Sequence, residues 1–347
     1  MKRKIIITVI LSFFIILLVG YTISKNNHNV LTSGHQRDEL VIYSSHPLDF
    51  LRPLIEEFES KTGILVTVVS GGTGQLIERI EEEQDNPYAD ILWGGSLSSL
   101  KSQSYLFEEY SSINEDAIQE EFKNNEGMLT KFSDVPSILM VNTDLIGNIQ
   151  INGYKDLLNP KLKGKIAYCN PAVSSSAYEH LINILYAMGN GNPDEGWDYV
   201  KLLCDNLDGK LLKSSTEVYR GVENGEFVVG LIFEEAAAAL VANGENIKIV
   251  YMEEGVLSTP DCVSIVKNSP HMESARTFID FVTGYEAQTM VTTELNRRSV
   301  RADVKTPKYL KAKDEIKIIH ADDELVYEKK KEWIQKFKEI FLDINEE

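Results

Sequence analysis

The architecture follows from one early stretch, ELVIYSSHPLDFLRPLIEEFESKTGILVTVVSGGTG (residues 39–74). Residues 39–44 have the pattern of a short strand, and residues 47–61 place apolar side chains on one helical face that ends at Gly63. Residues 64–69 are β-branched and apolar, which is typical of a buried strand. Because a helix separates the two strands, the stretch predicts a right-handed crossover and parallel pairing.

The same alternation continues along the chain. Residues 75–83 predict a second helix, and residues 90–93 predict a third strand. Further strands are predicted at residues 135–141, 165–168, 227–233, 247–251 and 259–266, and further helices at 175–188, 193–206, 214–223, 236–242 and 324–344.

This alternation predicts an α/β fold with two lobes, because 347 residues exceed what one compact core usually takes. We assign residues 39–137 together with 257–347 to the first lobe and residues 138–256 to the second. Each lobe is expected to be a mainly parallel sheet flanked by helices. Two crossing strands should join the lobes as a hinge.

Residues 1–38 are expected to lie outside this fold. A basic run (residues 2–4) precedes an almost wholly apolar stretch (residues 5–23), which indicates an export signal about long enough to span a bilayer. The basic residues keep the N-terminus in the cytoplasm, so the rest of the chain lies outside. Tyr21 stands where a lipoprotein signal has its cysteine, and residues 22–24 are a weak cleavage site. We favour an uncleaved membrane anchor followed by a polar tether, with secretion after cleavage as the alternative.

The charge and the motif content exclude several function classes. The formal net charge is −18, which disfavours binding to nucleic acid or to anionic lipid. Cys169, Cys204 and Cys262 are widely spaced and form neither a disulfide framework nor a zinc motif. The phosphate-binding loop, the dinucleotide-binding motif, the hydrolase elbow and the zinc-protease motif are all absent. We therefore expect no cofactor and no metal ion.

Small, donor-rich turns follow the predicted strands. Residues 44–46 (SSH), 70–74 (SGGTG) and 93–96 (WGGS) lie at the carboxyl ends of parallel strands, the edge at which ligands bind in such sheets. Each turn opens a helix, where free N–H groups and the helix dipole favour an anion. Residues 170–177 (NPAVSSSA) repeat the pattern in the second lobe. A serine before a helix is usually only a cap, but four such turns together favour a ligand site.

Further candidate residues lie next to these turns. His46 could donate to an anion or only support its turn. A tryptophan such as Trp93 is more often a core residue than a ligand platform, but its position at a strand end favours the cleft. Glu234 and Glu235 follow a buried strand and could bind ligand hydroxyls or an amine, or simply stabilise a helix N-terminus. Arg220 is expected to be solvated. The predicted ligand-binding residues are Ser44, Ser45, His46, Gly72, Thr73, Gly74, Trp93, Gly94, Gly95, Ser174, Ser175, Ser176, Glu234 and Glu235.

These turns, in this order, resemble the type II periplasmic-binding-protein family, in the branch of ferric iron, thiamine, phosphonate and sugar-phosphate binders. The resemblance is carried by residues 41–74, 90–96, 164–181 and 223–237, with NRRSV (residues 296–300) similar to the family's closing segment. It implies a monomeric extracellular solute-binding protein that delivers a small anionic ligand to the permease subunits of an ABC importer.

The resemblance leaves the ligand open between two classes. Ferric binders of this group carry adjacent tyrosines where this chain has Glu234 and Glu235. That departure favours a sugar phosphate or a phosphonate, with ferric iron as the alternative. Two other functions are an enzyme on the same scaffold, with Cys169 as nucleophile and one of these glutamates as base, and an extracellular sensor module. Saturable binding without turnover would distinguish a transport protein from an enzyme.

Overall fold

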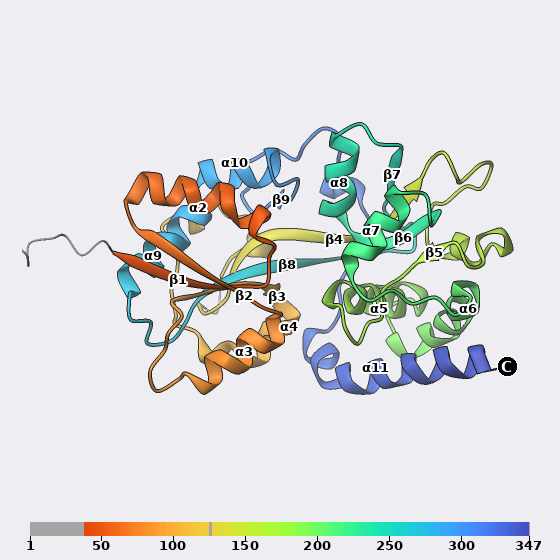
Figure 1. Cartoon of the computed structure of the whole chain (residues 1–347), viewed down its shortest axis with the longest axis horizontal. Helices are drawn as coiled ribbons and strands as arrows, with labels where there is room; N and C mark the ends of the chain where they lie inside the picture. The colour runs from red at the N-terminus through yellow and green to blue at the C-terminus, as the bar shows by residue number, and fades with distance from the viewer. Residues whose placement is uncertain (1–37, 125–126, 347) are drawn as a thin grey trace, which may run out of the picture. The chain divides into compact units, whose positions relative to one another are not determined.

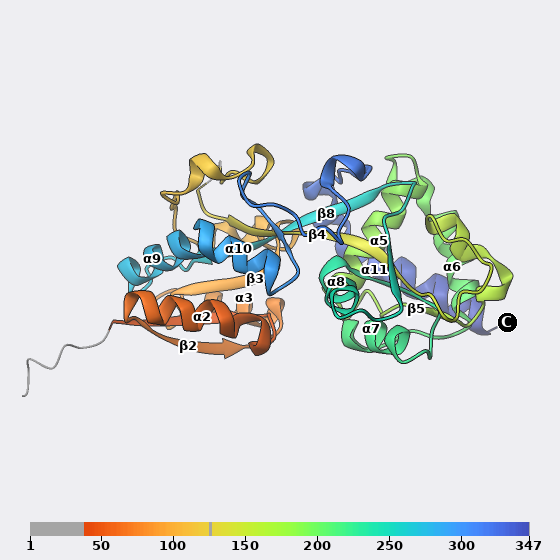
Figure 2. The same ribbon diagram turned by 90° about the horizontal axis from the view of Figure 1, so that it is seen from above.

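The computed structural model describes residues 38–124 and 127–346, which form an α/β fold with two lobes (Figures 1 and 2). The predicted membrane anchor at residues 5–23 lies outside the described residues. Within the described residues, no helix has both the length and the apolar character needed to cross a membrane.

The first lobe is a mixed sheet with helices on both faces. Its strand order is β2-β1-β3-β8-β4, and β9 also pairs with β4. The helices and strands of this lobe are β1 (Glu39–Ser44), α2 (Leu48–Thr62), β2 (Leu65–Ser70), α3 (Thr73–Glu82), β3 (Ile91–Ser96), α4 (Leu97–Leu100), β4 (Thr130–Asn142), β8 (Val256–Ile265), α9 (Met272–Val282), α10 (Tyr285–Thr293) and β9 (Arg298–Ser299).

Strand β1 forms the centre of the parallel part of this sheet. Leu40 and Ile42 pack in the core beneath α2 and α9, whereas Val41 and Tyr43 pack on the opposite face beneath α3. This alternation explains why β1 reads as continuously apolar, since both of its faces are covered. The predicted parallel pairing of β1 with β2 is confirmed. However, β2 is an edge strand and Leu65 is 40 % exposed, so the expectation of a buried strand was wrong.

The second lobe is built around the far half of β4. Its other strands and helices are β5 (Ile166–Ala167), α5 (Ser175–Met188), α6 (Trp197–Leu207), α7 (Ser215–Glu223), β6 (Val229–Phe233), α8 (Glu234–Ala242) and β7 (Ile247–Val250). Strand β4 enters this lobe from the hinge while β6 runs back towards it, so these two strands are antiparallel. β7 is also antiparallel to β4, whereas β5 and β6 pair in parallel. This sheet therefore differs from the mainly parallel one that we expected.

Strands β4 and β8 run side by side from one lobe to the other and form the predicted hinge, with Pro136 opposite Ser258 (Figure 1). A further segment also reaches the second lobe near its C-terminus. β10 (Ile318–Ile319) pairs with the start of β8, and α11 (Asp323–Glu346) follows it.

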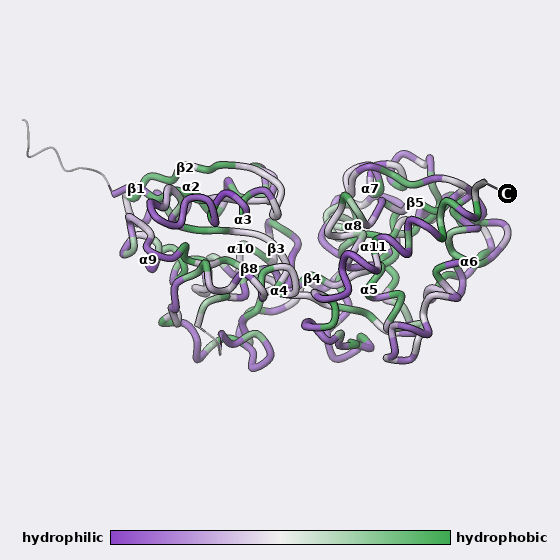
Figure 3. Tube along the Cα trace, turned by 90° about the horizontal axis from the view of Figure 1, so that it is seen from below, coloured by the Kyte–Doolittle hydropathy of each residue, from purple (hydrophilic) through white to green (hydrophobic). Residues whose placement is uncertain are grey.

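Helix α11 packs against the second lobe. Its tube alternates between hydrophilic and hydrophobic stretches (Figure 3), and Trp333 and Phe337 are each only 2 % exposed in the core of the second lobe. The Phe337 ring lies 5.9 Å from that of Tyr168, near the end of β5. From the sequence alone, residues 257–347 are assigned to the first lobe. We now propose that α11 belongs to the second lobe, because that is the core its apolar face covers.

A buried histidine lies in the core of the second lobe. The Tyr154 hydroxyl donates to Nδ1 of His180 at 3.1 Å, and Nε2–H of His180 donates to the Ile232 carbonyl at 2.9 Å. Both contacts fit the neutral ring. Burial lowers the pKa of His180 from 6.5 to about 4.

We expect this histidine to make the protein less stable in mild acid. Between pH 6.5 and 4 the unfolded chain binds a proton that the folded chain refuses, so the free energy of unfolding falls as the pH falls. At full effect the loss is about 3 kcal/mol. Urea unfolding of the wild type and of His180→Gln at pH 7 and pH 4.5 measures it. The variant should lose this part of the pH slope, and an equal slope in both proteins would contradict the prediction.

Candidate functional site

Three turns of the first lobe meet at one edge of its sheet. The Gly71 N–H donates to the Ser44 carbonyl at 3.2 Å, and the Ser44 hydroxyl donates to the Trp93 carbonyl at 2.7 Å. These bonds join the turns after β1 and β2 to β3. Residues 93–96, predicted as a turn, are the end of this strand, which runs to Ser96. The convergence follows from the parallel pairing of the three strands, which ends them at the same edge.

Two glycines allow the turns to approach closely. Gly94 and Gly95 have φ values of +119° and +102°, which residues with a side chain rarely adopt. A Cβ atom on Gly94 would lie 2.4 Å from the Ser45 hydroxyl, and one on Gly95 would lie 2.8 Å from the methyl group of Thr73. The structure therefore brings Ser45, Thr73 and these two glycines together.

Helix N-termini open at the same edge. The first residues of α2 and α3 have no side-chain acceptor from their caps, Pro47 and Gly72. In the second lobe, Ser174 caps α5 by accepting from the Ala177 N–H at 3.3 Å, while Ser175 is exposed and Ser176 half-buried. Uncapped N–H groups and nearby hydroxyls are donors suited to an anion.

Two predicted site residues serve the core instead. Trp93 is fully buried, with its ring 5.2 Å from those of both Phe132 and Phe278. It cannot form a platform for a ligand because it faces the same side of β3 as Ile91, towards the first core. Ser44 is also fully buried, and its hydroxyl is used within the turn.

His46 connects its turn to residues that the sequence analysis missed. Its Nε2 lies 2.8 Å from Oδ2 of Asp261 on β8, and the same oxygen accepts from Nη1 of Arg297 at 2.9 Å. Burial alone would raise the pKa of Asp261, but the charges and hydrogen bonds of His46 and Arg297 hold it below its ordinary value. Phe50 lies against both side chains, with its ring 4.6 Å from the His46 ring and 4.3 Å from the Arg297 guanidinium carbon.

The two consecutive glutamates pair with two consecutive arginines. Glu234 accepts from Nε and Nη2 of Arg298 at 2.7 and 2.8 Å, and the Tyr251 hydroxyl also donates to it. Both charged side chains are almost fully buried. Burial raises the pKa of Glu234, an effect that the Arg298 hydrogen bonds and charge oppose. Glu235 accepts from Nε of Arg297.

A third carboxylate of the second lobe contacts the first lobe. Glu179 lies on α5, shortly after the serine-rich turn. It accepts from the Ser98 hydroxyl of α4 at 3.1 Å and from the Thr259 hydroxyl of β8 at 3.0 Å. Burial raises the pKa of Glu179. These contacts hold the start of α5 near α4, the helix that follows β3.

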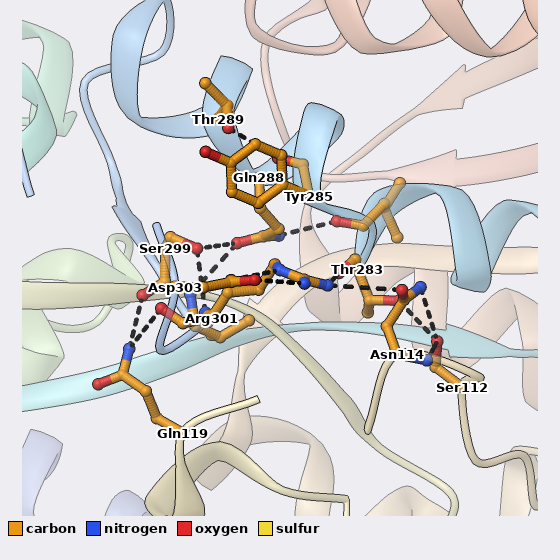
Figure 4. A network of polar contacts seen from close by, with 12 residues as sticks. Ser112, Asn114, Gln119, Thr283, Tyr285, Gln288, Thr289, Ser299, Arg301 and Asp303 are labelled. Atoms are coloured by element: carbon orange, nitrogen blue, oxygen red, sulfur yellow. Dashed lines mark hydrogen bonds and ion pairs between the residues drawn. The ribbon is translucent and has the colours of Figure 1, made fainter. Parts of the chain in front are cut away.

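The segment that carries Arg297 and Arg298 (residues 297–303) is held to the first lobe by a polar network (Figure 4). Arg301 donates to both carboxylate oxygens of Asp303 at 2.8 and 2.9 Å and to the Thr283 carbonyl at 3.0 Å. Ser299 donates to the Gln288 side chain at 2.7 Å. All of these partners belong to the first lobe. Arg297 and Arg298 therefore extend from the first lobe and contact the glutamates of the second lobe.

Cys169 does not have the surroundings of a nucleophile. It is 1 % exposed and forms no disulfide within the described residues, and burial raises the pKa of its thiol. A reactive cysteine usually has a lowered pKa and contact with solvent.

Comparison with known proteins extends this description. Residues 86–323 match the family model described as "Bacterial extracellular solute-binding protein". The chain is 26% identical to a putative 2-aminoethylphosphonate-binding periplasmic protein of Salmonella typhimurium, over 72% of this chain and 73% of that protein. It is 25% identical to iron uptake protein A1 of Synechocystis, over 74% of each chain. Among solved structures it is similar to the periplasmic binding protein AfuA of Actinobacillus pleuropneumoniae with fructose-6-phosphate bound, with a TM-score of 0.77, 26% identity, and coverage of 88% of this chain and 99% of that one.

Proposed function

Because the chain belongs to the bacterial extracellular solute-binding proteins of ABC transporters, we propose that it captures a small organic phosphate or phosphonate for import. The ligand would lie between the lobes, with its anionic group at the turns of the first lobe. Permease subunits in the membrane would receive it. We further propose that residues 5–23 direct the protein out of the cytoplasm, as an anchor or as a cleaved signal.

The convergence of the three turns carries this proposal. Ser45, Thr73 and the two glycines near the end of β3 lie close enough to share one small ligand, and the N-termini of α2 and α3, whose cap residues offer no side-chain acceptor, open beside them. Neutral donors of this kind bind a phosphate group through backbone N–H groups and hydroxyls. One relative is named for 2-aminoethylphosphonate, and the similar AfuA structure has fructose-6-phosphate bound.

Ferric iron has less support from the site, although iron uptake protein A1 of Synechocystis and an Fe(3+)-binding periplasmic protein of Serratia marcescens are both similar to this chain. Glu234 and Glu235, which stand where ferric binders have tyrosines, are both paired with arginines. Two guanidinium groups beside these carboxylates would repel a trivalent cation. In the part of the chain that the structure describes, no group of three or more acidic, histidine or cysteine side chains is placed to hold a metal ion.

Loss of a turn hydroxyl is expected to weaken ligand binding without unfolding the protein. Each lost hydrogen bond to a charged group corresponds to about 1.5–3 kcal/mol, or roughly tenfold to a hundredfold in affinity. Calorimetry on Thr73→Ala and Ser175→Ala, with glucose 6-phosphate, 2-aminoethylphosphonate and ferric citrate as ligands, measures this loss. Thr277→Ala is the matched control, since this threonine on α9 is exposed and its hydroxyl donates to the Glu273 carbonyl of its own helix. Tight binding of iron with no binding of any organic phosphate would sink the proposal.

A further inference from the structure

The two glutamate–arginine pairs between the lobes differ in how firmly they are held. Arg298 and Glu234 are 3 % and 2 % exposed, and two guanidinium nitrogens contact the carboxylate. Arg297 contacts Glu235 through Nε alone, and the Glu235 side chain is 21 % exposed. The first pair has the geometry of a fixed structural contact. The second has a partner that can move into water.

Arg297 has one nitrogen left for another acceptor. Nε donates to Glu235, and Nη1 donates to Asp261 and Ser133. Within the described residues, no hydrogen bond uses Nη2, and Nη2 is not among the fully buried polar atoms that lack a partner. The side chain as a whole is only 9 % exposed, so its remaining exposure is consistent with Nη2 reaching solvent.

This nitrogen belongs to a group beside the ligand turns. The Arg297 guanidinium and the His46 ring lie against the same phenyl ring, that of Phe50, and both contact one oxygen of Asp261. An anion held by the turn at Ser44–His46 would therefore have a cation at its side.

The local charges decide whether that cation is available. One guanidinium is shared by two carboxylates, Asp261 and Glu235, so an incoming anion meets an already neutralised arginine. Asp261 is buried and also contacts His46, so it remains paired with Arg297 when the ligand enters. Glu235 is the counterion that can leave, because water can replace the single hydrogen bond that it loses.

We propose that Arg297 is a further ligand-binding residue and that Glu235 is its exchangeable counterion, which the anionic group of the ligand displaces. This rests on the proposed function and adds a cationic donor to the neutral donors of the turns. On binding, an oxygen of the ligand accepts from Nη2 and then from Nε as Glu235 turns into water. The empty protein thus shields the Arg297 guanidinium and releases it only to an anion.

Removal of the counterion should strengthen anion binding. With inorganic phosphate as the probe, Glu235→Gln should bind about tenfold more tightly than the wild type, and Arg297→Gln should bind about tenfold to a hundredfold more weakly. In the double variant the gain from Glu235→Gln should vanish, because the neutral side chain at residue 297 no longer has a charge to release. Calorimetry of the full chain measures all three.

The exposed pair Arg220 and Glu223 on α7 supplies matched controls. Glu223 is 20 % exposed, close to the exposure of Glu235, and it accepts from Arg220 at 2.6 Å. Glu223→Gln and Arg220→Gln remove the same charges and should leave phosphate affinity within twofold of the wild type.

The outcomes separate this inference from the proposed function. If the Glu235–Arg297 pair only holds the lobes together, Glu235→Gln will bind phosphate equally or more weakly, and the inference is overturned. The proposed function still stands in that case if Thr73→Ala weakens binding of an organic phosphate. If neither the wild type nor Glu235→Gln binds any of the anions, both are overturned. A gain that persists in the Arg297→Gln background would also contradict the exchange.

Discussion

Replacement of Arg298 by methionine is expected to lower the free energy of unfolding by about 3–5 kcal/mol at neutral pH. The change leaves the Glu234 carboxylate buried without its cation and removes the bond from Arg298 to the Lys311 carbonyl, 2.6 Å long. Burial already raises the pKa of Glu234, and loss of the arginine should raise this pKa further. The folded variant then holds a proton that the unfolded chain releases, so its deficit should be largest at pH 7–8 and shrink towards pH 4.5.

A second substitution tests the cause. Arg298→Met with Glu234→Leu removes both charges and should recover part of the lost stability, because a buried pair is often replaceable by apolar groups of similar size. Urea unfolding followed by circular dichroism measures the single and double variants. A single variant within 1 kcal/mol of the wild type, or a double variant less stable than the single one, would show that the pair does not anchor this part of the fold.

Replacement of Phe337 by alanine is expected to destabilise the protein by about 3–5 kcal/mol. Its ring is buried in the second core and contacts Tyr168, so truncation loses apolar contact area and leaves a cavity. The predicted loss follows from the packing of α11 on the second lobe. The same urea experiment measures it.

Tyr327 provides the control on the same helix. It is 49 % exposed, so Tyr327→Ala should change the free energy of unfolding by no more than about 0.5 kcal/mol. If Phe337→Ala proved as mild as Tyr327→Ala, α11 would not be part of the second core. Loss of stability in both variants to the same extent would point to an effect on the helix itself rather than on its packing.

The candidate site was predictable where local pattern fixes geometry. The turns after β1 and β2 and the end of β3 could be placed together from sequence because parallel strands end at one edge of their sheet, although residues 93–96 extend β3 instead of forming the predicted turn. The same reasoning misplaced Trp93, since a position at a strand end does not tell which face the side chain takes. Ile91 and Trp93 share the face that packs on the first core. Because side chains alternate between the two faces of a strand, the buried position of Trp93 could have been predicted from that of Ile91.

By itself, the sequence determined the order and type of most elements, the parallel start of the first sheet and the two-lobed class. These follow from the period of apolar residues and from turn residues, which act over a few positions. Only the tertiary structure decided the partners of Glu234 and Glu235, which lie 64 and 62 residues away in the chain, and the lobe that α11 covers. The physical reason is that a charge or an apolar face on one element specifies the kind of partner but not its location. The location depends on how β4 and β8 carry the chain between the lobes and on where the closing segment returns.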